Sequence, residues 1–322
     1  MFALRWAIVV LFTLLAVPAQ AQQDWPTKPV RWIVPYAAGG FADTSVRKLT
    51  AELTKVLKQS VVVENRAGAG GVVGTEMIAK AAPDGYTFGS GNLAPLAVNP
   101  SLMQQLPYDV ARDIAPILLI ETAPLILTVG PSLPAKTVRD VVAMAKERPG
   151  KLTFGSSGIG GAHHLSGEML CQQAGVKMVH VPYKGGAPAA TDLLGGHLSI
   201  MFEMGYAALP SIQSGKVRAL AVTSSKRLAI LPDVPTMAEA GFPGFESFNW
   251  QGVVGPAKMP RPIIERLNRE LNGILQIPHI RESIVSLGSE IAGGTPEDFG
   301  RFIQAEMEKW AKVIREGNIK AE

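Results

Sequence analysis

Cysteine is almost absent from this sequence, which has one among its 322 residues. A single cysteine excludes a disulfide framework and the zinc and iron–sulfur sites that are built from several cysteines. Basic residues outnumber acidic residues only by 31 to 27 and form no concentrated run, so we expect no nucleic acid partner. After residue 17, no apolar run is long enough to cross a membrane. Because no P-loop, HExxH or CxxC motif is present, we also expect no cofactor and no bound metal.

The composition is typical of a globular protein, with 47% hydrophobic residues, 33 glycines and 24 prolines. Such a composition excludes disordered, collagen-like and coiled-coil chains. The length is too great for one small core and suits about two domains.

The first 21 residues have the three parts of a secretory signal peptide. Arg5 supplies the positive charge, about twelve apolar residues follow at 6–17, and an Ala-Gln-Ala triplet supplies the cleavage site. At about 1.5 Å per residue, the apolar run falls well short of the roughly 30 Å core of a bilayer, so it does not predict a membrane anchor. No cysteine follows the cleavage site, so we expect no lipid anchor. We predict cleavage after Ala21 and a soluble exported product that begins at Gln22.

Short apolar runs alternate with segments of helical period along the rest of the chain. We predict strands at 30–35, 61–63, 87–89, 114–120, 125–129, 153–156, 178–181, 199–202 and 219–222. We predict helices at 44–57, 72–82, 138–147, 165–174, 189–194, 262–275, 280–287 and 296–314. Strands that alternate with helices favour parallel sheets covered by helices on both faces. The predicted fold class is therefore α/β.

Two stretches mark where we expect the chain to pass between two sheets. Residues 114–129 are apolar but are interrupted at 122–124 by Thr-Ala-Pro, as if one strand left a sheet and another entered the next. A second such crossing is expected at 245–254. We therefore predict that residues 22–124 and 250–322 form lobe 1, and that residues 125–249 form an inserted lobe 2. No linker rich in glycine or serine separates the lobes, so we expect them to pivot on short strands.

Four clusters that contain glycine follow predicted strands and precede predicted helices, at 35–43, 68–74, 155–161 and 183–186. At such a turn the backbone N–H groups point outward, and the start of the helix adds roughly half a positive charge. A turn of this kind binds a carboxylate or phosphate without a basic side chain. Each cluster taken alone is also explained by the tight turn that any βα unit needs. Because the clusters at 35–43 and 155–161 fall in different predicted lobes, we expect them to face each other across a cleft.

The groups needed for catalysis are incomplete. Ser157 does not lie in a GxSxG motif, and the sequence displays no acidic partner for a serine–histidine pair. His163 and His164 are adjacent, so on a helix they point about 100° apart and do not share one metal ion. An exported α/β hydrolase that uses Ser157 with His163 or His164 stays as the alternative to a binding protein.

Several further residues have both a structural and a functional interpretation. Asp43 is expected to cap a helix that begins at Thr44. Lys184 either pairs with an anionic ligand or lies on the surface. Glu203, at the end of an apolar strand, either faces the cleft or pairs with a nearby base. Cys171 is expected to be a buried small apolar residue.

Seven segments, in order along the chain, resemble the Bug-type periplasmic solute-binding proteins of tripartite tricarboxylate transporters. They are NRAGAGG at 65–71, PDGYT at 83–87, LPYD at 106–109, HVPYKG at 180–185, LAVTS at 220–224, LPDVPT at 231–236 and KWAKVI at 309–314. The resemblance implies a two-lobed flytrap fold in the periplasm, with each lobe a mostly parallel sheet flanked by helices. It also implies that the loops at 36–43 and 156–164 hold the carboxylate of the ligand, largely through backbone groups and water.

Two departures from the usual pattern of the family fall in these loops. Ala37 and Ala38 stand where prolines usually precede the Gly-Gly pair, and the bulky Phe41 follows that pair. Ala162 and His163 stand where a serine or threonine usually precedes the helix. Loss of a hydroxyl donor, with gain of an aromatic ring and an imidazole, suits a larger or aromatic acid.

The resemblance implies a receptor that captures a small carboxylated organic acid, with aromatic and dicarboxylic acids in its range, and delivers it to membrane permease subunits. We expect a monomer without enzymatic activity. A subunit that presents its bound ligand to a membrane regulator needs the same flytrap, so the sequence does not separate transport from sensing. The residues expected to bind the ligand are Tyr36, Ala37, Ala38, Gly39, Gly40, Phe41, Asp43, Asn92, Ser156, Ser157, Gly158, Gly160, Gly161, Ala162, His163, Tyr183, Lys184, Gly185, Phe202 and Glu203.

Overall fold

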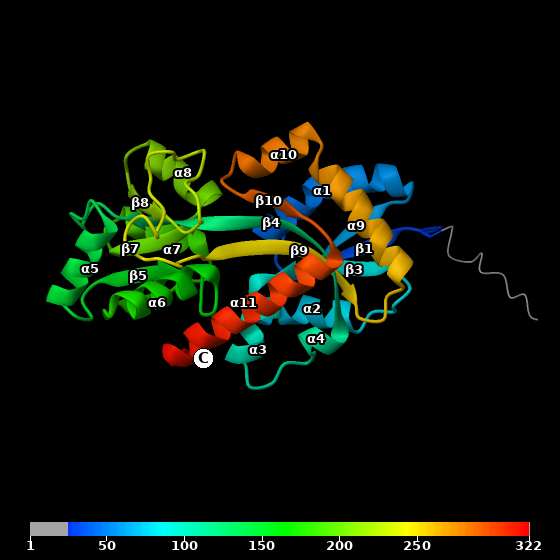
Figure 1. Ribbon diagram of the computed structural model, residues 1–322, viewed down its shortest axis with the longest axis horizontal. Helices are drawn as coiled ribbons and strands as arrows, with labels where there is room; N and C mark the ends of the chain where they lie inside the picture. The colour runs from blue at the N-terminus through cyan, green and yellow to red at the C-terminus, as the bar shows by residue number, and fades with distance from the viewer. Residues whose placement is uncertain (1–24, 322) are drawn as a thin grey trace, which may run out of the picture.

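The computed structural model describes residues 25–321, and the predicted signal peptide lies outside them. Strands and helices alternate along most of the chain, which confirms the α/β class (Figure 1). No helix among the described residues combines the length and the apolar character that a membrane span requires.

The strands and helices follow one another closely along the chain. The strands are β1 (Val30–Val34), β2 (Val61–Asn65), β3 (Thr87–Asn92), β4 (Ile114–Val129), β5 (Thr153–Ser156), β6 (Val179–Pro182), β7 (Ile200–Met204), β8 (Arg218–Val222), β9 (Phe248–Pro256) and β10 (Glu290–Gly293). The α-helices are α1 (Phe41–Leu57), α2 (Val72–Ala79), α3 (Asn99–Leu102), α4 (Val110–Asp113), α5 (Val138–Glu147), α6 (Ala162–Ala174), α7 (Gly186–Leu194), α8 (Gly205–Gln213), α9 (Arg261–Leu275), α10 (Pro278–Val285) and α11 (Pro296–Glu316). A short 3-10 turn, η1 (Ala69–Gly71), and a π-helical turn, η2 (Ala94–Val98), precede α2 and α3.

The strands form one sheet in the order β2-β1-β3-β9-β4-β7-β5-β6, and β8 and β10 pair with β4 beside this path. β1 pairs in parallel with β2 and β3, and β5 pairs in parallel with β6 and β7. The pairs that involve β4 or β9 are antiparallel. The sheet is therefore mixed. Parallel βα units of the predicted kind build its two ends, and antiparallel strands join them.

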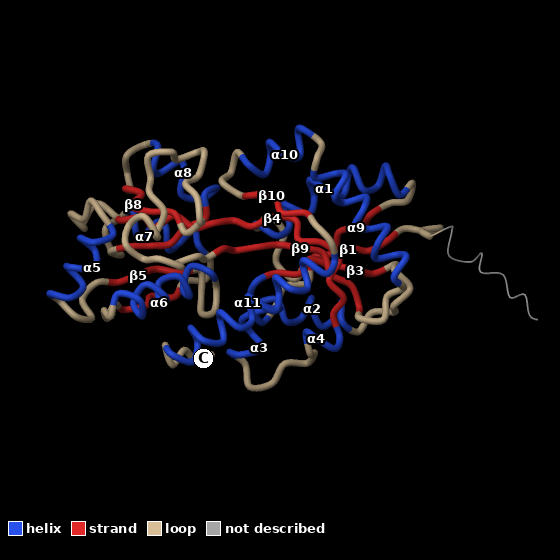
Figure 2. The backbone as a smooth tube through the Cα atoms, viewed as in Figure 1, coloured by secondary structure: helices blue, strands red, loops and turns tan. Residues whose placement is uncertain are grey.

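β4 lies in the middle of the sheet and changes partners along its length. Residues 114–124 pair with β9, whereas residues 125–129 pair with β7 and β8. Figure 2 shows β4 and β9 extending along the long axis of the molecule from one group of helices to the other. The predicted break in the strand at 122–124 is wrong, because these residues pair one by one with residues 248–250 of β9 and the backbone stays extended. The exchange of pairing partners expected at this stretch is present, between residues 124 and 125. The division into lobes near residue 124 stays a prediction.

Buried apolar clusters cover both faces of the sheet. On one face, Trp32 and Phe88 pack edge to face with ring centroids 5.2 Å apart, beneath the apolar sides of α1 and α9. On the other face, α11 places Phe299 against Trp250 of β9, with ring centroids 5.9 Å apart. Because helices anchor the strands from both sides, the loops at the strand ends start from fixed positions.

Some elements differ from the predicted ones. α1 begins earlier than expected, at Phe41 with Gly40 as its N-cap, so the prediction that Asp43 caps a helix from Thr44 is wrong. The sequence did not predict α8, which contains Pro210, because a proline inside a helix is a breaker signal. It also did not predict β10 or the short helical turns between residues 94 and 113.

Candidate functional site

One cavity of about 710 Å³ lies where several strands end and helices begin. Its lining comes from the junctions β1–α1, β3–η2, β5–α6, β6–α7 and β7–α8, together with Gly70 and with Asn249 of β9. In α/β proteins, ligands bind at the carboxyl ends of strands, at turns of this kind. β1 and β3 belong to one end of the sheet, and β5, β6 and β7 belong to the other, so both ends contribute to one cavity.

Most of the residues that were expected to bind the ligand line this cavity. They are Tyr36, Ala37, Ala38, Gly39, Gly40, Phe41, Asn92, Ser157, Gly158, Gly161, Ala162, His163, Gly185 and Glu203. The structure therefore brings the first and third glycine clusters to the same space. The expected residues outside the lining are Asp43, Ser156, Gly160, Tyr183, Lys184 and Phe202.

Three of these residues have other surroundings that account for their position outside the lining. Phe202 alternates with Glu203 along β7 and points to the opposite face, where its ring stacks on Phe245 at a centroid distance of 5.8 Å. The hydroxyl of Tyr183 donates to the carboxylate of Asp192 over 2.6 Å. Lys184 is exposed on the surface.

Ser156 and Gly160 support the loop before α6 from outside the cavity. Oγ of Ser156 lies 2.6 Å from Nε2 of His180 on the neighbouring strand β6. Gly160 has a φ of 75°, a left-handed conformation that favours glycine, and a Cβ there would meet the side chain of Leu102 at 2.7 Å. These two residues shape the loop.

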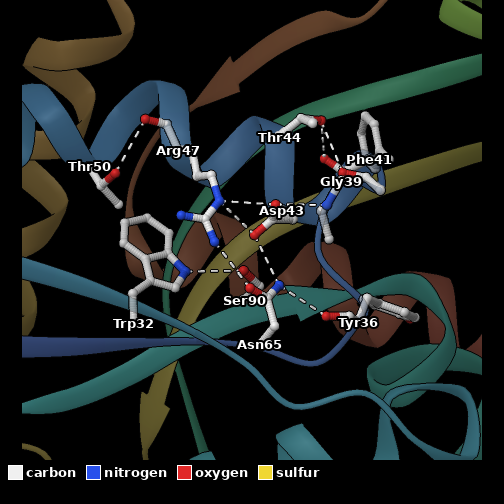
Figure 3. A network of polar contacts seen from close by, with 12 residues as sticks. Trp32, Tyr36, Gly39, Phe41, Asp43, Thr44, Arg47, Thr50, Asn65 and Ser90 are labelled. Atoms are coloured by element: carbon white, nitrogen blue, oxygen red, sulfur yellow. Dashed lines mark hydrogen bonds and ion pairs between the residues drawn. The ribbon is translucent and has the colours of Figure 1, made fainter.

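The loop that follows β1 is held by Asp43, which lies in the first turn of α1 (Figure 3). Its carboxylate accepts the N–H of Gly39 over 2.9 Å, the amide of Asn65 over 2.9 Å and the guanidinium of Arg47 over 3.0 Å. Asn65 also donates to the carbonyl oxygen of Tyr36 over 3.1 Å. Chiefly because of the hydrogen bond from Arg47, the pKa of Asp43 is lowered to about 2, so this carboxylate is charged at physiological pH. Asp43 therefore positions the loop from behind.

Asp43→Ala is expected to lower the free energy of unfolding by about 1–3 kcal/mol near neutral pH, because Gly39 N–H and the Asn65 amide lose their acceptor. The Arg47 side chain is 52% exposed, so its ion pair contributes less than about 1 kcal/mol of this. Since the folded pKa of Asp43 is lowered, its contribution is present above about pH 4 and is lost as the pH falls toward about 2. Urea unfolding of parent and variant at about pH 7 and about pH 3 measures the difference. A difference that does not shrink in acid contradicts this role.

Two long helices, α1 and α6, begin at the cavity. Gly40 and Phe41 line it at the start of α1, and Gly161 and Ala162 line it at the start of α6. The N–H groups of a first helical turn have no partner within the helix, and the helix dipole places about half a positive charge at that end. The shorter helices α7 and α8 also begin at the cavity. No lysine or arginine of residues 25–321 lines the cavity, so these helix starts are the feature that favours an anion.

Ser157 and His163 form a hydrogen-bonded pair in the cavity wall, with 2.9 Å between Oγ and Nδ1. Burial lowers the pKa of His163 to about 4, so the imidazole is neutral at physiological pH. Among the described residues, no carboxylate is hydrogen-bonded to His163. The pair is therefore a neutral polar surface that lacks the third group of a catalytic triad.

Glu203 lines the cavity from β7 and is only 3% exposed. Its Oε1 lies 2.8 Å from Oγ1 of Thr128 on β4, and burial raises the pKa of the carboxyl group. It forms no ion pair with a base in the part of the chain that the structure describes. Of the two interpretations from the sequence, the structure favours the one in which Glu203 faces the cleft.

A family model described as the tripartite tricarboxylate transporter family receptor matches residues 45–319. The chain belongs to this family. Protein BugT of Bordetella pertussis is 40% identical to it over 307 residues, which are 95% of this chain and 94% of BugT. The resemblance seen in the sequence is therefore confirmed.

Solved structures share the architecture of this family receptor. The R. palustris protein Rpa4515 with adipate has a TM-score of 0.83 and 36% identity, and the match covers 92% of this chain and 99% of that one. MatC (Rpa3494) from Rhodopseudomonas palustris, with bound malate, has a TM-score of 0.79 and 31% identity, over 90% and 100% of the chains. The periplasmic binding protein BugD has a TM-score of 0.80 and 35% identity, over 92% and 100%. The chain is thus a solute-binding receptor with the periplasmic-binding-protein fold, and its family implies a periplasmic location.

The sequence did not identify the part of the receptor's cavity that comes from α8 and β9. Met204 and Tyr206 flank the start of α8, and the ring of Tyr206 stacks on Phe41 with centroids 6.4 Å apart and planes 9° apart. No glycine cluster marks this junction, and Asn249 arrives from a strand far along the chain, so local patterns could not reveal either. Ala42 and Ile159 line the cavity from the two loops expected to hold the ligand, and Gly70 and Gly186 line it from two of the glycine clusters, although none of the four was among the expected ligand residues. The other lining residues that were missed are Leu93, Ala94, Ala187, Ala190, Met201 and Ala207.

Proposed function

We propose that this receptor captures a small organic acid by its carboxylate and delivers it to the membrane permease subunits of a tripartite tricarboxylate-type transporter. The observation that carries the proposal is the position of the α1 and α6 starts on one cavity that no lysine or arginine of the described residues lines. Backbone N–H groups at helix starts satisfy a carboxylate without a basic side chain. The relatives with adipate and with malate support the proposal, because both ligands are carboxylates.

The proposal includes closure of two lobes, residues 22–124 with 250–322 and residues 125–249, on the ligand. β4 and β9 join the two ends of the sheet, so we propose that they bend as the lobes close. Phe41 of α1 and Tyr206 of α8 already stack on each other at the cavity. A ligand that contacts both helix starts stabilises the closed arrangement of a monomer. Small-angle scattering is expected to show a smaller radius of gyration with ligand.

A thermal-shift screen with monocarboxylic, dicarboxylic and aromatic acids tests the carboxylate requirement. At about 100 times Kd a ligand stabilises the folded state by about 2.7 kcal/mol, which raises the melting temperature by several degrees. Calorimetry then compares each acid that binds with its methyl ester, which lacks the charge and adds one methyl group. We expect only the acid to bind. An ester that binds as tightly as its acid removes the carboxylate from the proposal.

The alternative function, an exported hydrolase, would depend on the Ser157–His163 pair. A general base works best with a pKa near the operating pH, and the pKa of His163, at about 4, lies well below it. We therefore propose that the pair only hydrogen-bonds the ligand. NMR spectra of the methyl ester of the acid, after long incubation with the protein, are expected to show no free acid and no methanol. A product that forms with the parent and disappears with Ser157→Ala establishes the hydrolase instead.

We further propose that the mature receptor begins at Gln22, after removal of a signal peptide at 1–21. Intact-mass measurement on protein from the periplasmic fraction is expected to show the loss of these residues. A full-length mass in that fraction contradicts the cleavage.

Deletion of the gene, followed by assays of both acid uptake and gene induction, separates transport from sensing.

A further inference from the structure

We infer that the ligand carries, besides its carboxylate, a hydroxyl, amide or ammonium group that donates a hydrogen bond to Glu203. This inference rests on the proposed function, in which the carboxylate lies at the helix starts. Glu203 is the acidic residue of the described cavity lining, and its side chain is almost completely buried. An acceptor in that position selects the second polar group of the ligand.

Thr128 indicates which oxygen of Glu203 is available to a ligand. Oγ1 of Thr128 lies 3.0 Å from the carbonyl oxygen of Met201 and 2.8 Å from Oε1 of Glu203. The hydroxyl of Thr128 has one hydrogen, and the carbonyl oxygen of Met201 can only accept. When a protonated Oε1 of Glu203 donates to Thr128, the hydroxyl hydrogen is therefore donated to Met201. When Glu203 is ionised, Thr128 donates to Oε1 instead. In these two arrangements Oε2 is an acceptor, whereas a proton on Oε2 would make Glu203 a donor, so the inference requires the form in which Oε2 carries no proton.

Asn92 adds a second acceptor to the lining, from the other end of the sheet. It is 3% exposed, and its Oδ1 has no hydrogen-bond partner among the described residues. Nε2 of Gln251 donates to the carbonyl oxygen of Ala42 over 3.1 Å. Oε1 of Gln251 therefore points the other way, and it accepts from Nδ2 of Asn92 over 3.4 Å. The orientation of both amides is therefore set by their neighbours. Oδ1 has almost no accessible surface, so a donor on the ligand would satisfy this unpaired acceptor only if the Asn92 side chain shifts.

When Oε2 of Glu203 carries no proton, a second carboxylate at this position meets acceptors only. In that form Oε2 offers no hydrogen, and no lysine or arginine of the described residues lines the cavity to compensate the charge. Unpaired acceptors and like charges in a buried site reject a ligand far more strongly than a small difference in size does. Acids of equal length that differ only in their second polar group are therefore expected to differ widely in affinity.

Calorimetry with matched pairs of acids tests the inference. The pairs are succinate and 4-hydroxybutyrate, glutarate and 5-hydroxypentanoate, and adipate and 6-hydroxyhexanoate. At the chain length that fits best, we expect the hydroxy acid to bind at least about tenfold more tightly than the dicarboxylate. A dicarboxylate that binds as tightly as its hydroxy acid overturns the inference and leaves the proposed function standing. If none of the six acids binds although another acid of the thermal-shift screen does, the inference fails and the proposed function stands.

Two variants of Glu203 assign the preference to this side chain. Glu203→Gln keeps an acceptor toward the ligand while its amide donates to Thr128, so the preference for the hydroxy acid is expected to persist. Glu203→Met removes the acceptor, and the affinity ratio of the pair is expected to fall to about one. Glu121→Met is the matched control, since Glu121 is equally buried, at 3% exposure, but lies outside the lining. An unchanged ratio in folded Glu203→Met overturns the assignment.

Discussion

Gly40→Asp is expected to lower the affinity for the acid about a thousandfold while the protein stays folded. Gly40 is the N-cap of α1 with a φ of −79°, and a Cβ there meets only the carbonyl oxygen of Ala37, at 3.6 Å. The new carboxylate lies at the helix start, where it accepts hydrogen bonds from the backbone N–H groups that the ligand would otherwise use. It also repels the negative charge of the ligand. Two unit charges about 4 Å apart repel by about 4 kcal/mol at an effective dielectric constant of about 20, which is about a thousandfold in Kd. Aspartate is also a good N-cap residue, so we do not expect the melting temperature to fall.

Two further glycine variants separate charge at the site from charge or crowding elsewhere. Gly273→Asp adds the same charge to α9, where a Cβ meets nothing within 4 Å, and is expected to leave the affinity unchanged and to change the free energy of unfolding by less than about 1 kcal/mol. At Gly74 a Cβ would meet Cα of Pro35 at 2.6 Å, so Gly74→Asp is expected to lower the melting temperature. Calorimetry and circular dichroism melts on the three variants give both quantities. A folded Gly40→Asp protein that binds as tightly as the parent places the carboxylate elsewhere.

Trp250→Ala is expected to lower the free energy of unfolding by about 3–5 kcal/mol. The ring is fully buried on β9, where it packs against Phe299 of α11, and its N–H donates to Glu306 over 3.1 Å. Truncation opens a cavity between the strand and the helix and leaves Trp310 as the indole donor to the buried Glu306. We therefore expect this to be the most damaging of the proposed substitutions.

Trp250→Phe is the control for the loss of volume. It retains an aromatic ring against α11 and removes the hydrogen bond to Glu306, so its expected cost is about 1–3 kcal/mol. Urea unfolding followed by circular dichroism measures both variants. If Trp250→Ala lowers the free energy of unfolding no more than Trp250→Phe does, the packing of the Trp250 ring against α11 does not stabilise the protein.

The glycine clusters predicted the positions of the loops at 36–43 and 156–164, because glycine-rich turns between a strand and a helix can be recognised from local sequence. They did not predict where α1 begins. The apolar spacing of that helix starts at Val46, whereas the first turn from Phe41 is set by a hydrogen bond from Gly39 to Asp43. That contact depends on the shape of the loop, which residue spacing alone does not reveal.

Long-range pairing accounts for most of what the sequence could not show. β4 continues through Pro124 because β9, more than a hundred residues later, pairs with it there. Glu203 and Asn92 lie far apart in the chain and enter one cavity only because the order of strands brings both ends of the sheet together. The sequence identified both as candidates and left open whether Glu203 faces the cleft.

The most direct test is a crystal structure with the acid that gives the largest rise in melting temperature. It shows whether the carboxylate lies between the starts of α1 and α6. The predicted result has the carboxylate oxygens within about 3.2 Å of backbone nitrogens, or of waters bound to them, at residues 40–42 and 161–163. The remainder of the ligand is then expected to extend toward Glu203. A carboxylate that is instead paired with a surface base such as Lys184, with both helix starts left without a ligand contact, contradicts the account.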